Sequence, residues 1–170
     1  MIVTTLGSCV SACVRDDRTG FSGMNHFMLP GGGNCDWGGA GFSLRFGDFA
    51  MESLLNAFYS TGSRKQDLSV KLFGGGNVAD FSRSIGDHNA QFAIDYLANE
   101  AIEIASSDLG GRRARRIHFY SDSGKVQRRF VAVTEARTVA VVTEENRYRE
   151  SLAEKRAQSG SVELFDQEEE

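Results

Sequence analysis

A cysteine and a histidine near the start of the chain carry the side chains needed to attack a carbonyl carbon. Cys9 follows the pair Gly7-Ser8, and His26 lies in an apolar segment seventeen residues further on. A cysteine attacks as its thiolate, which is the minor form of an ordinary thiol at neutral pH. An adjacent imidazole takes the thiol proton and later returns it to a leaving amine. If the fold brings the two side chains together, the pair predicts hydrolysis or transfer at an amide.

The same two residues also have a purely structural interpretation. Cysteine is among the most buried residue types, and in a regular strand His26 would share a face with Met24 and Met28 as a core residue. The residues before Cys9 favour catalysis, because a tight turn of small residues can present backbone N–H groups to an oxyanion. From the residues alone, both interpretations stay open.

The elements that position these residues are predicted from hydrophobic periodicity. Residues 10–14 fit either a strand or a short buried helix. Amphipathic helices are expected over 48–59 and 87–99, with Asp87 as the N-cap of the second, and a third helix is expected from Thr143. A glycine-rich loop is predicted at 31–41 and a polar turn at 106–111. Strands are predicted at 2–6, 24–29, 69–73, 101–105, 117–120, 126–133 and 138–142.

Composition limits the class of protein. The chain has 170 residues, of which 41% are hydrophobic and 25% charged, and this is ordinary for a globular domain. We expect a single domain over 1–165, followed by an acidic tail at 166–170. The net charge of −4 argues against a general nucleic-acid binder, and no apolar run is long enough for membrane insertion. An odd count of three cysteines favours a reducing compartment, so we expect a cytoplasmic protein.

Several segments, taken in order over about residues 3–135, resemble the chemoreceptor glutamine deamidases, the CheD family. The family pattern K-L-F-G-G-x-N is similar to KLFGGGNV, I-G-x-x-N to IGDHN, and D-x-G-G-x-x-x-R to DLGG followed by Arg115 or Arg116. The segments that carry the resemblance are TLGSCV at 5–10, GMNHFMLP at 23–30, KLFGGGNV at 71–78, IGDHN at 85–89, DLGG at 108–111 and SGKV at 123–126.

The resemblance implies an α/β fold with β-sheets packed together and helices on the outside. It also implies a catalytic trio in which Cys9 is the nucleophile, His26 is the base and a threonine completes the site. Thr4 and Thr5 point to opposite faces of a regular strand, so one of them can reach the imidazole, and we favour Thr4. The remaining expected site residues are Gly7 and Ser8 in the oxyanion turn, and Asn25, Gly110 and Gly111 in substrate binding.

The activity implied is hydrolysis of particular receptor glutamines to glutamate in bacterial chemotaxis, with release of ammonia and without a metal or organic cofactor. The expected partners are the cytoplasmic helices of chemoreceptors and a chemotaxis phosphatase. The family usually carries a further segment before the first strand. The basic run 112–116 has two interpretations from charge alone, a contact for an acidic partner or a solvated loop.

Three other hypotheses compete with the deamidase. The first is a non-catalytic binding partner of a chemotaxis phosphatase. The second is a zinc site made of Cys9, Cys13, His26 and Cys35, although their spacing matches no known zinc pattern. The third keeps the nucleophile but gives a transglutaminase-like or peptidase activity.

Overall fold

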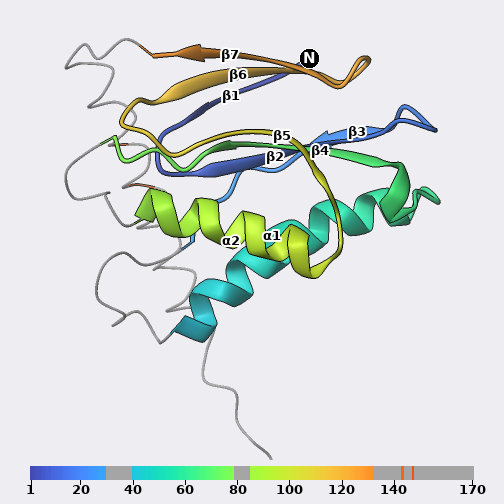
Figure 1. The fold of residues 1–170 in the computed structure, drawn as a ribbon, viewed down its shortest axis with the longest axis horizontal. Helices are drawn as coiled ribbons and strands as arrows, with labels where there is room; N and C mark the ends of the chain where they lie inside the picture. Colours follow the sequence, from blue (N-terminus) through green and yellow to red (C-terminus); the bar gives the residue numbers. More distant parts are fainter. Residues whose placement is uncertain (30–39, 79–84, 132–142, 144–146, 148–170) are drawn as a thin grey trace, which may run out of the picture.

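The computed structural model describes residues 1–29, 40–78 and 85–131, together with Thr143 and Arg147. These residues form three layers, in which one sheet packs on a second sheet and two helices cover the far side of the second sheet (Figure 1). The α/β fold with packed sheets and outer helices, expected from the sequence, is confirmed.

The first sheet has three antiparallel strands in the order β1-β6-β7. They are β1 (Ile2–Leu6), β6 (Arg115–Tyr120) and β7 (Lys125–Phe130). The strands β6 and β7 form the predicted hairpin. Because β1 is paired on one side, it is an edge strand of this sheet.

The second sheet has the order β3-β2-β4-β5, with β4 and β5 parallel and the other pairs antiparallel. Its strands are β2 (Val10–Asp16), β3 (Ser22–Met24), β4 (Leu68–Gly74) and β5 (Ile104–Leu109). The helices are α1 (Ala40–Tyr59) and α2 (Ile85–Asn99), and a short 3-10 helix, η1 (Lys65–Asp67), precedes β4.

The alternation of side chains along β2 supplies two separate cores. Val10, Ala12 and Val14 face the helices and pack in one cluster with Met51 and Leu97. Residues at the alternate positions of a strand face the opposite side. On that side lies a second buried cluster, made of Leu6, Cys9, Cys13, Met28, Phe73, Ile85, Ile117 and Phe119. Cys9 therefore lies in the layer between the two sheets.

Polar side chains join the two sheets at both ends. At one end, Arg15 donates a hydrogen bond to Ser121 O (2.6 Å) and Lys71 Nζ donates to Gly124 O (2.8 Å) in the hairpin turn. At the other end, buried Arg115 of β6 donates to the backbone and side chain of Asp108 on β5 and to Gly110 O. The relative position of the two sheets, and hence of any residue between them, is fixed at both ends.

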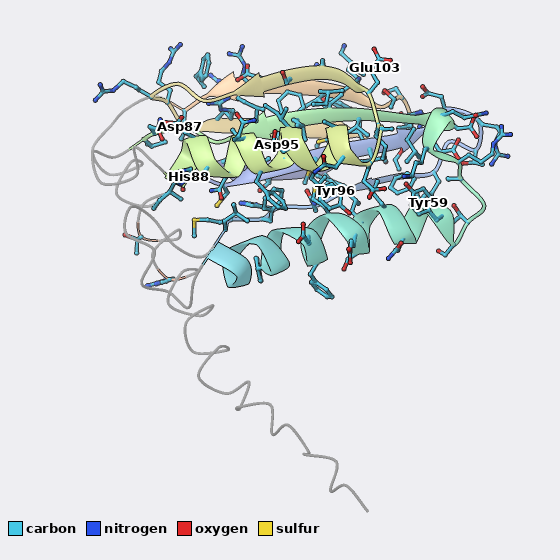
Figure 2. The ribbon with its side chains drawn as sticks, turned by 60° about the horizontal axis from the view of Figure 1, so that its bottom comes forward. Tyr59, Asp87, His88, Asp95, Tyr96 and Glu103 are labelled. Carbon is cyan, nitrogen blue, oxygen red and sulfur yellow. The ribbon has the colours of Figure 1, made fainter. Side chains whose placement is uncertain are left out.

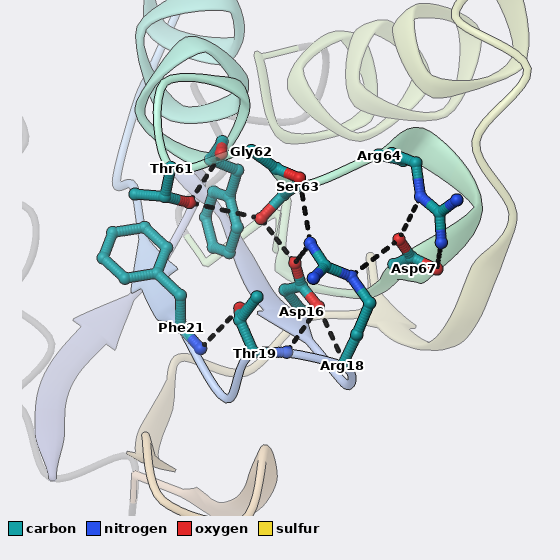
Figure 3. Close-up of polar contacts among 10 residues, drawn as sticks. Asp16, Arg18, Thr19, Phe21, Thr61, Gly62, Ser63, Arg64 and Asp67 are labelled. Atoms are coloured by element: carbon teal, nitrogen blue, oxygen red, sulfur yellow. Dashed lines mark hydrogen bonds and ion pairs between the residues drawn. The ribbon is translucent and has the colours of Figure 1, made fainter.

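A buried carboxylate ties the turn after β2 to the segment after α1 (Figure 3). Asp16 accepts hydrogen bonds from Ser63 Oγ (2.5 Å) and from the backbone N–H groups of Arg18 (2.8 Å) and Thr19 (2.9 Å). The Ser63 bond is the main reason why the pKa of Asp16 is lowered to about 2.

The structure corrects four of the predicted boundaries. The strand predicted over 24–29 is β3 at Ser22–Met24, followed by an irregular segment with a single bridge at Phe27. The run at 10–14, for which the sequence left strand and helix open, is a strand, so it is not one of the four corrections. The first helix begins at Ala40, not at residue 48, so the end of the predicted glycine-rich loop is helical. The polar turn predicted at 106–111 is largely β5, because an exposed edge strand beside β4 needs no apolar alternation.

The fourth correction concerns the start of α2. Asp87 is not the N-cap, because the helix begins at Ile85. Its carboxylate instead accepts a hydrogen bond from Asn77 Nδ2 (3.0 Å), which joins the first turn of the helix to the glycine-rich segment after β4.

The strand predicted at 138–142, the loop at 31–39 with Cys35, and the tail at 166–170 lie outside the described residues. Of the predicted third helix, Thr143 and Arg147 are described, and both are helical. Among the helical residues that are described, no stretch combines the length and apolar character that crossing a bilayer needs.

Candidate active site

Backbone pairing places Cys9 and His26 on the same side of the second sheet. Val10 and Phe27 exchange two hydrogen bonds of 2.9 Å, in the register that pairs Cys13 with Met24. Val10 and Phe27 point into the helix-side core, so their neighbours Cys9 and His26 point into the layer between the sheets. In this register the two residues are diagonal neighbours, a relationship that brings long side chains within reach of each other.

Thr4 reaches the same imidazole from the other sheet. Its Oγ1 lies 2.9 Å from His26 Nδ1. Thr4 pairs with buried Ile117 and shares its inward face, whereas Thr5 pairs with exposed Arg116 and faces outward. Of the two threonines that the sequence left open, the structure therefore brings Thr4 to His26.

The three side chains lie at a surface boundary. His26 is exposed, Thr4 is half-buried and Cys9 is only 5% exposed. The imidazole thus lies at the solvent side of the group, with the sulfur beneath it.

Cys13, which lies within β2, has a different environment from Cys9, which precedes the strand. Burial raises the pKa of Cys13 to about 12. Cys13 is therefore a protonated packing residue over the physiological range of pH. Within the part of the chain that the structure describes, no three His, Cys, Asp or Glu side chains group as metal ligands, and Cys35 of the zinc hypothesis lies outside that part.

The turn before Cys9 is held by the glycine-rich end of β4. Gly76 N donates to Gly7 O (2.7 Å) and Gly75 N donates to Cys9 O (2.8 Å). Gly74 has a φ of +114°, and a Cβ at this position would lie 2.1 Å from Cys9 O. Close backbone approach thus requires glycine at residue 74, and it fixes the carbonyl of the cysteine.

A buried asparagine of α2 joins the two segments that carry Cys9 and His26. Asn89 Nδ2 donates to Ser8 O (2.8 Å), and Asn89 Oδ1 accepts from Leu29 N (2.8 Å). The side chain is fully buried, so both bonds are shielded from water. One amide group therefore sets the position of the Cys9 turn relative to the segment that carries His26.

Asn25, expected to contact substrate, makes structural hydrogen bonds beside the site. The side-chain Oδ1 of Asn25 accepts a hydrogen bond from Ala12 N (2.8 Å), which in a regular antiparallel pair would bind the backbone carbonyl of Asn25. The Nδ2 of Asn25 donates to Ala50 O (3.2 Å). Its carbonyl oxygen accepts from Ser11 Oγ (2.6 Å). These bonds hold the irregular segment before His26 against β2. A contact with substrate stays a prediction.

Gly110 and Gly111 lie near the nucleophile turn. Gly110 N donates to Gly74 O (2.9 Å), and Gly111 O accepts from Asn77 N (2.7 Å). Both glycines have positive φ angles and open space where a Cβ would lie. Their role in substrate binding also stays a prediction.

The structure separates the members of the predicted basic run 112–116. Arg115 is buried beneath the loop of Gly110, so it cannot contact a partner, and this part of the partner interpretation is wrong. Arg112, Arg113 and Arg116 are exposed.

Sequence reasoning did not assign roles to Asn89 or to the glycines after β4. Both lie in segments that the sequence singles out, IGDHN and KLFGGGNV. The sequence motifs mark these residues, but the roles of the residues depend on which segments meet in space.

Comparison with known proteins agrees with this architecture. Residues 28–130 match the family described as CheD, chemotactic sensory transduction. Proteins of Rhodopseudomonas palustris (strain BisA53) and Halorhodospira halophila are each 44% identical to the chain, over 97% of its length and 76% and 77% of theirs. A protein of Caulobacter sp. (strain K31) is 43% identical, over 97% of the chain and 84% of its own length. All three are named probable chemoreceptor glutamine deamidase CheD. The chain therefore belongs to the CheD family.

Proposed function

We propose that this protein is a protein-glutamine deamidase that converts glutamines of chemotaxis receptors to glutamate. The relatives that are 43–44% identical to the chain carry this activity in their names. The structural observation that supports it is the 2.9 Å contact between Thr4 Oγ1 and His26 Nδ1, on the face of the sheet that also carries Cys9.

In the proposed mechanism, His26 takes the proton of Cys9. If the Nδ1–H of His26 donates to Thr4 Oγ1, the lone pair of Nε2 is left to act as base. Thr4 then holds the imidazole in the useful tautomer, as the third member of a catalytic triad does. The predicted oxyanion role of Gly7 and Ser8 stays part of this proposal.

The reaction has two steps. The Cys9 sulfur attacks the amide carbon, and His26 delivers its proton to the departing nitrogen, so that ammonia leaves and a thioester forms. Water then attacks the thioester with His26 as base. Glutamate is released, and the thiol of Cys9 is restored.

The setting of this reaction is also a proposal. We place it in the cytoplasm, with the cytoplasmic helices of chemoreceptors as substrate. The odd count of three cysteines suits a reducing compartment. A chemotaxis phosphatase as a second partner, and a single domain over 1–165, stay predictions.

The test is the conversion of glutamine to glutamate in a purified chemoreceptor fragment, read at each site by peptide mass spectrometry. Wild-type protein is expected to convert particular glutamines and release one ammonia for each, whereas Cys9→Ala and His26→Gln are expected to be inactive. Gln91→Ala, at an exposed position of α2 on the far side of the second sheet, is the control variant. Conversion by Cys9→Ala at the wild-type rate would refute the proposal.

A further inference from the structure

The outward face of the first sheet carries exposed basic side chains, among them Arg116, Arg129 and Lys125. Its inward face carries core residues such as Leu6 and Ile117. By register, the alternate positions Thr5, Arg116 and Arg129 form one outward rung. Both described helices pack on the far side of the other sheet, away from this face (Figure 1).

Two arginines on this face are directly opposite each other. Arg116 of β6 pairs with Arg129 of β7, and both are exposed. Among the described residues no carboxylate forms an ion pair with either of them, although Arg128, the inward neighbour of Arg129, is paired with Asp108 (2.6 Å). Like charges directly opposite on a sheet destabilise it. The fold gains nothing from this pair, which indicates that the charges serve an external contact.

One further cation lies on the outward face, at the hairpin end of β7. Exposed Lys125 shares the outward face of β7 with Arg129. Arg113, which precedes β6, is exposed but does not belong to this face, because its guanidinium lies 3.8 Å from the centre of the Phe130 ring, and Phe130 shares the inward face of β7 with Arg128. Arg113 O also lies close to Gly76, whose N–H binds Gly7 O in the nucleophile turn.

The face is separated from the candidate site by a single strand. Thr4 of β1 points inward to His26, and the next residue, Thr5, points outward beside Arg116. A protein bound on the outward face can therefore cross the β1 edge and present a side chain at His26 and Cys9.

The opposite side of the molecule has the reverse charge. Residues 46–59 of α1 and 85–99 of α2 include Asp48, Glu52, Asp87 and Asp95 and no lysine or arginine. Figure 2 shows Asp87 and Asp95 along α2. A molecule with one basic and one acidic side orients a charged partner before contact.

We propose that the Arg116–Arg129 face binds an acidic surface of the protein substrate, beside the glutamine to be deamidated. This rests on the proposed function and names the property by which the substrate is selected. A protein is favoured over a nucleic acid because the chain carries a net charge of −4 and the acidic helices would repel a long polyanion.

The test compares two double variants with the same net charge. Arg116→Gln/Arg129→Gln removes the two facing positive charges, and Asn56→Asp/Ala98→Glu adds two negative charges at exposed positions of the helices. Each double variant therefore changes the formal net charge from −4 to −6. The substrates are a purified chemoreceptor cytoplasmic fragment and an uncharged glutamine-containing peptide. Circular dichroism checks that each variant is folded.

On the receptor fragment at low salt, kcat/KM of the arginine double variant is expected to fall about tenfold, with the loss disappearing at high salt. Its activity on the peptide is expected to match wild type, and the helix variant is expected to match wild type on both substrates. Equal activity of the two double variants on the fragment would overturn the proposal.

Binding is measured separately so that the docking proposal and the proposed function fail independently. In the Cys9→Ala background, calorimetry gives the affinity for the receptor fragment with and without the arginine substitutions. Weaker binding after the substitutions supports the face even if wild type deamidates nothing. Unchanged binding, no binding by the parent, salt-sensitive binding of a DNA duplex to the two arginines, or a dimer that depends on them would each overturn it.

Discussion

Thr4 Oγ1 and His26 Nδ1 are 2.9 Å apart, although Thr4 lies in the first sheet, His26 lies in the segment that follows β3 of the second, and the two residues are 22 positions apart in the chain. The contact depends on the packing of one sheet on the other, which places the edge strand β1 beside the segment after β3. The site is therefore a product of the interface between the sheets and belongs to neither sheet alone.

The two threonines of β1 give a direct test of this contact. We expect Thr4→Val to lower kcat for glutamine deamidation by roughly a hundredfold, because the imidazole loses the group that orients it. Thr5→Val, which changes the outward face, should stay within about twofold of wild type. Steady-state kinetics on the uncharged glutamine-containing peptide, which does not depend on the outward face, measures both, and equal effects of the two substitutions would show that the orientation argument is wrong.

The thiols of Cys9 and Cys13 should differ in reactivity. In a Cys35→Ser background, iodoacetamide near neutral pH is expected to label Cys9 and leave Cys13 unmodified, because the pKa of Cys13 is raised to about 12 by burial. Site mapping by mass spectrometry measures the two rates. His26→Gln should slow the labelling of Cys9 about tenfold without changing Cys13. Comparable labelling of both cysteines in the folded protein would contradict the assigned roles.

Asn89 should affect stability and the reactivity of Cys9 together. Asn89→Leu leaves Ser8 O and Leu29 N without their partner, at a cost of about 1–3 kcal/mol for each group. Asn89→Asp keeps the acceptor for Leu29 N but loses the donor to Ser8 O. Urea denaturation gives the stability of each variant.

Alkylation of Cys9 then separates positioning from general stability. Below the denaturation transition, both Asn89 variants are expected to react more slowly than wild type, while Gln91→Ala, at an exposed position of the same helix, should react normally. Normal alkylation in both Asn89 variants would limit this residue to a structural role.

Asp16 should make stability depend on pH in the acid range. Its pKa is about 2 in the folded protein, mainly because Ser63 donates to it, and about 3.9 in an unfolded chain. Because the folded value is the lower one, ionised Asp16 stabilises the fold above the unfolded pKa, and this contribution is lost as the pH falls from about 4 to 2.

The matched variant is Asp16→Asn, which does not titrate. The difference in free energy of unfolding between wild type and this variant should be constant from about pH 5 to 7 and shrink below about pH 4. Urea denaturation at several pH values measures it. A difference that persists unchanged to about pH 2 would rule out the assigned titration.

Much of the architecture could be predicted from the sequence, because it depends on local patterns. The strand β1 and the hairpin of β6 and β7 follow from short apolar runs bounded by turn residues. The segment around His26 could not be predicted as observed, since Asn25 replaces its own carbonyl with its side chain in the ladder. The strand β5 was misplaced because it is held by pairing with β4 and not by an apolar pattern.

The same distinction applies to the site. Cys9 and His26 were identifiable as a chemically competent pair, the family resemblance limited the threonine to Thr4 or Thr5, and strand geometry allowed one of the two to reach the imidazole. Which threonine meets the imidazole depends on the packing of the sheets. The link from Asn89 to Ser8 and Leu29, and the burial of Arg115, depend on contacts between distant segments that spacing in the sequence does not reveal.

The most direct test of the account is the covalent intermediate on Cys9. Wild-type protein and Cys9→Ala are mixed with the receptor fragment, quenched with acid and analysed by intact-protein and peptide mass spectrometry. The account predicts a wild-type adduct equal in mass to enzyme plus substrate minus ammonia, located at Cys9, and neither adduct nor glutamate with Cys9→Ala. Glutamate formed by Cys9→Ala at the wild-type rate, with no adduct on either protein, would contradict it.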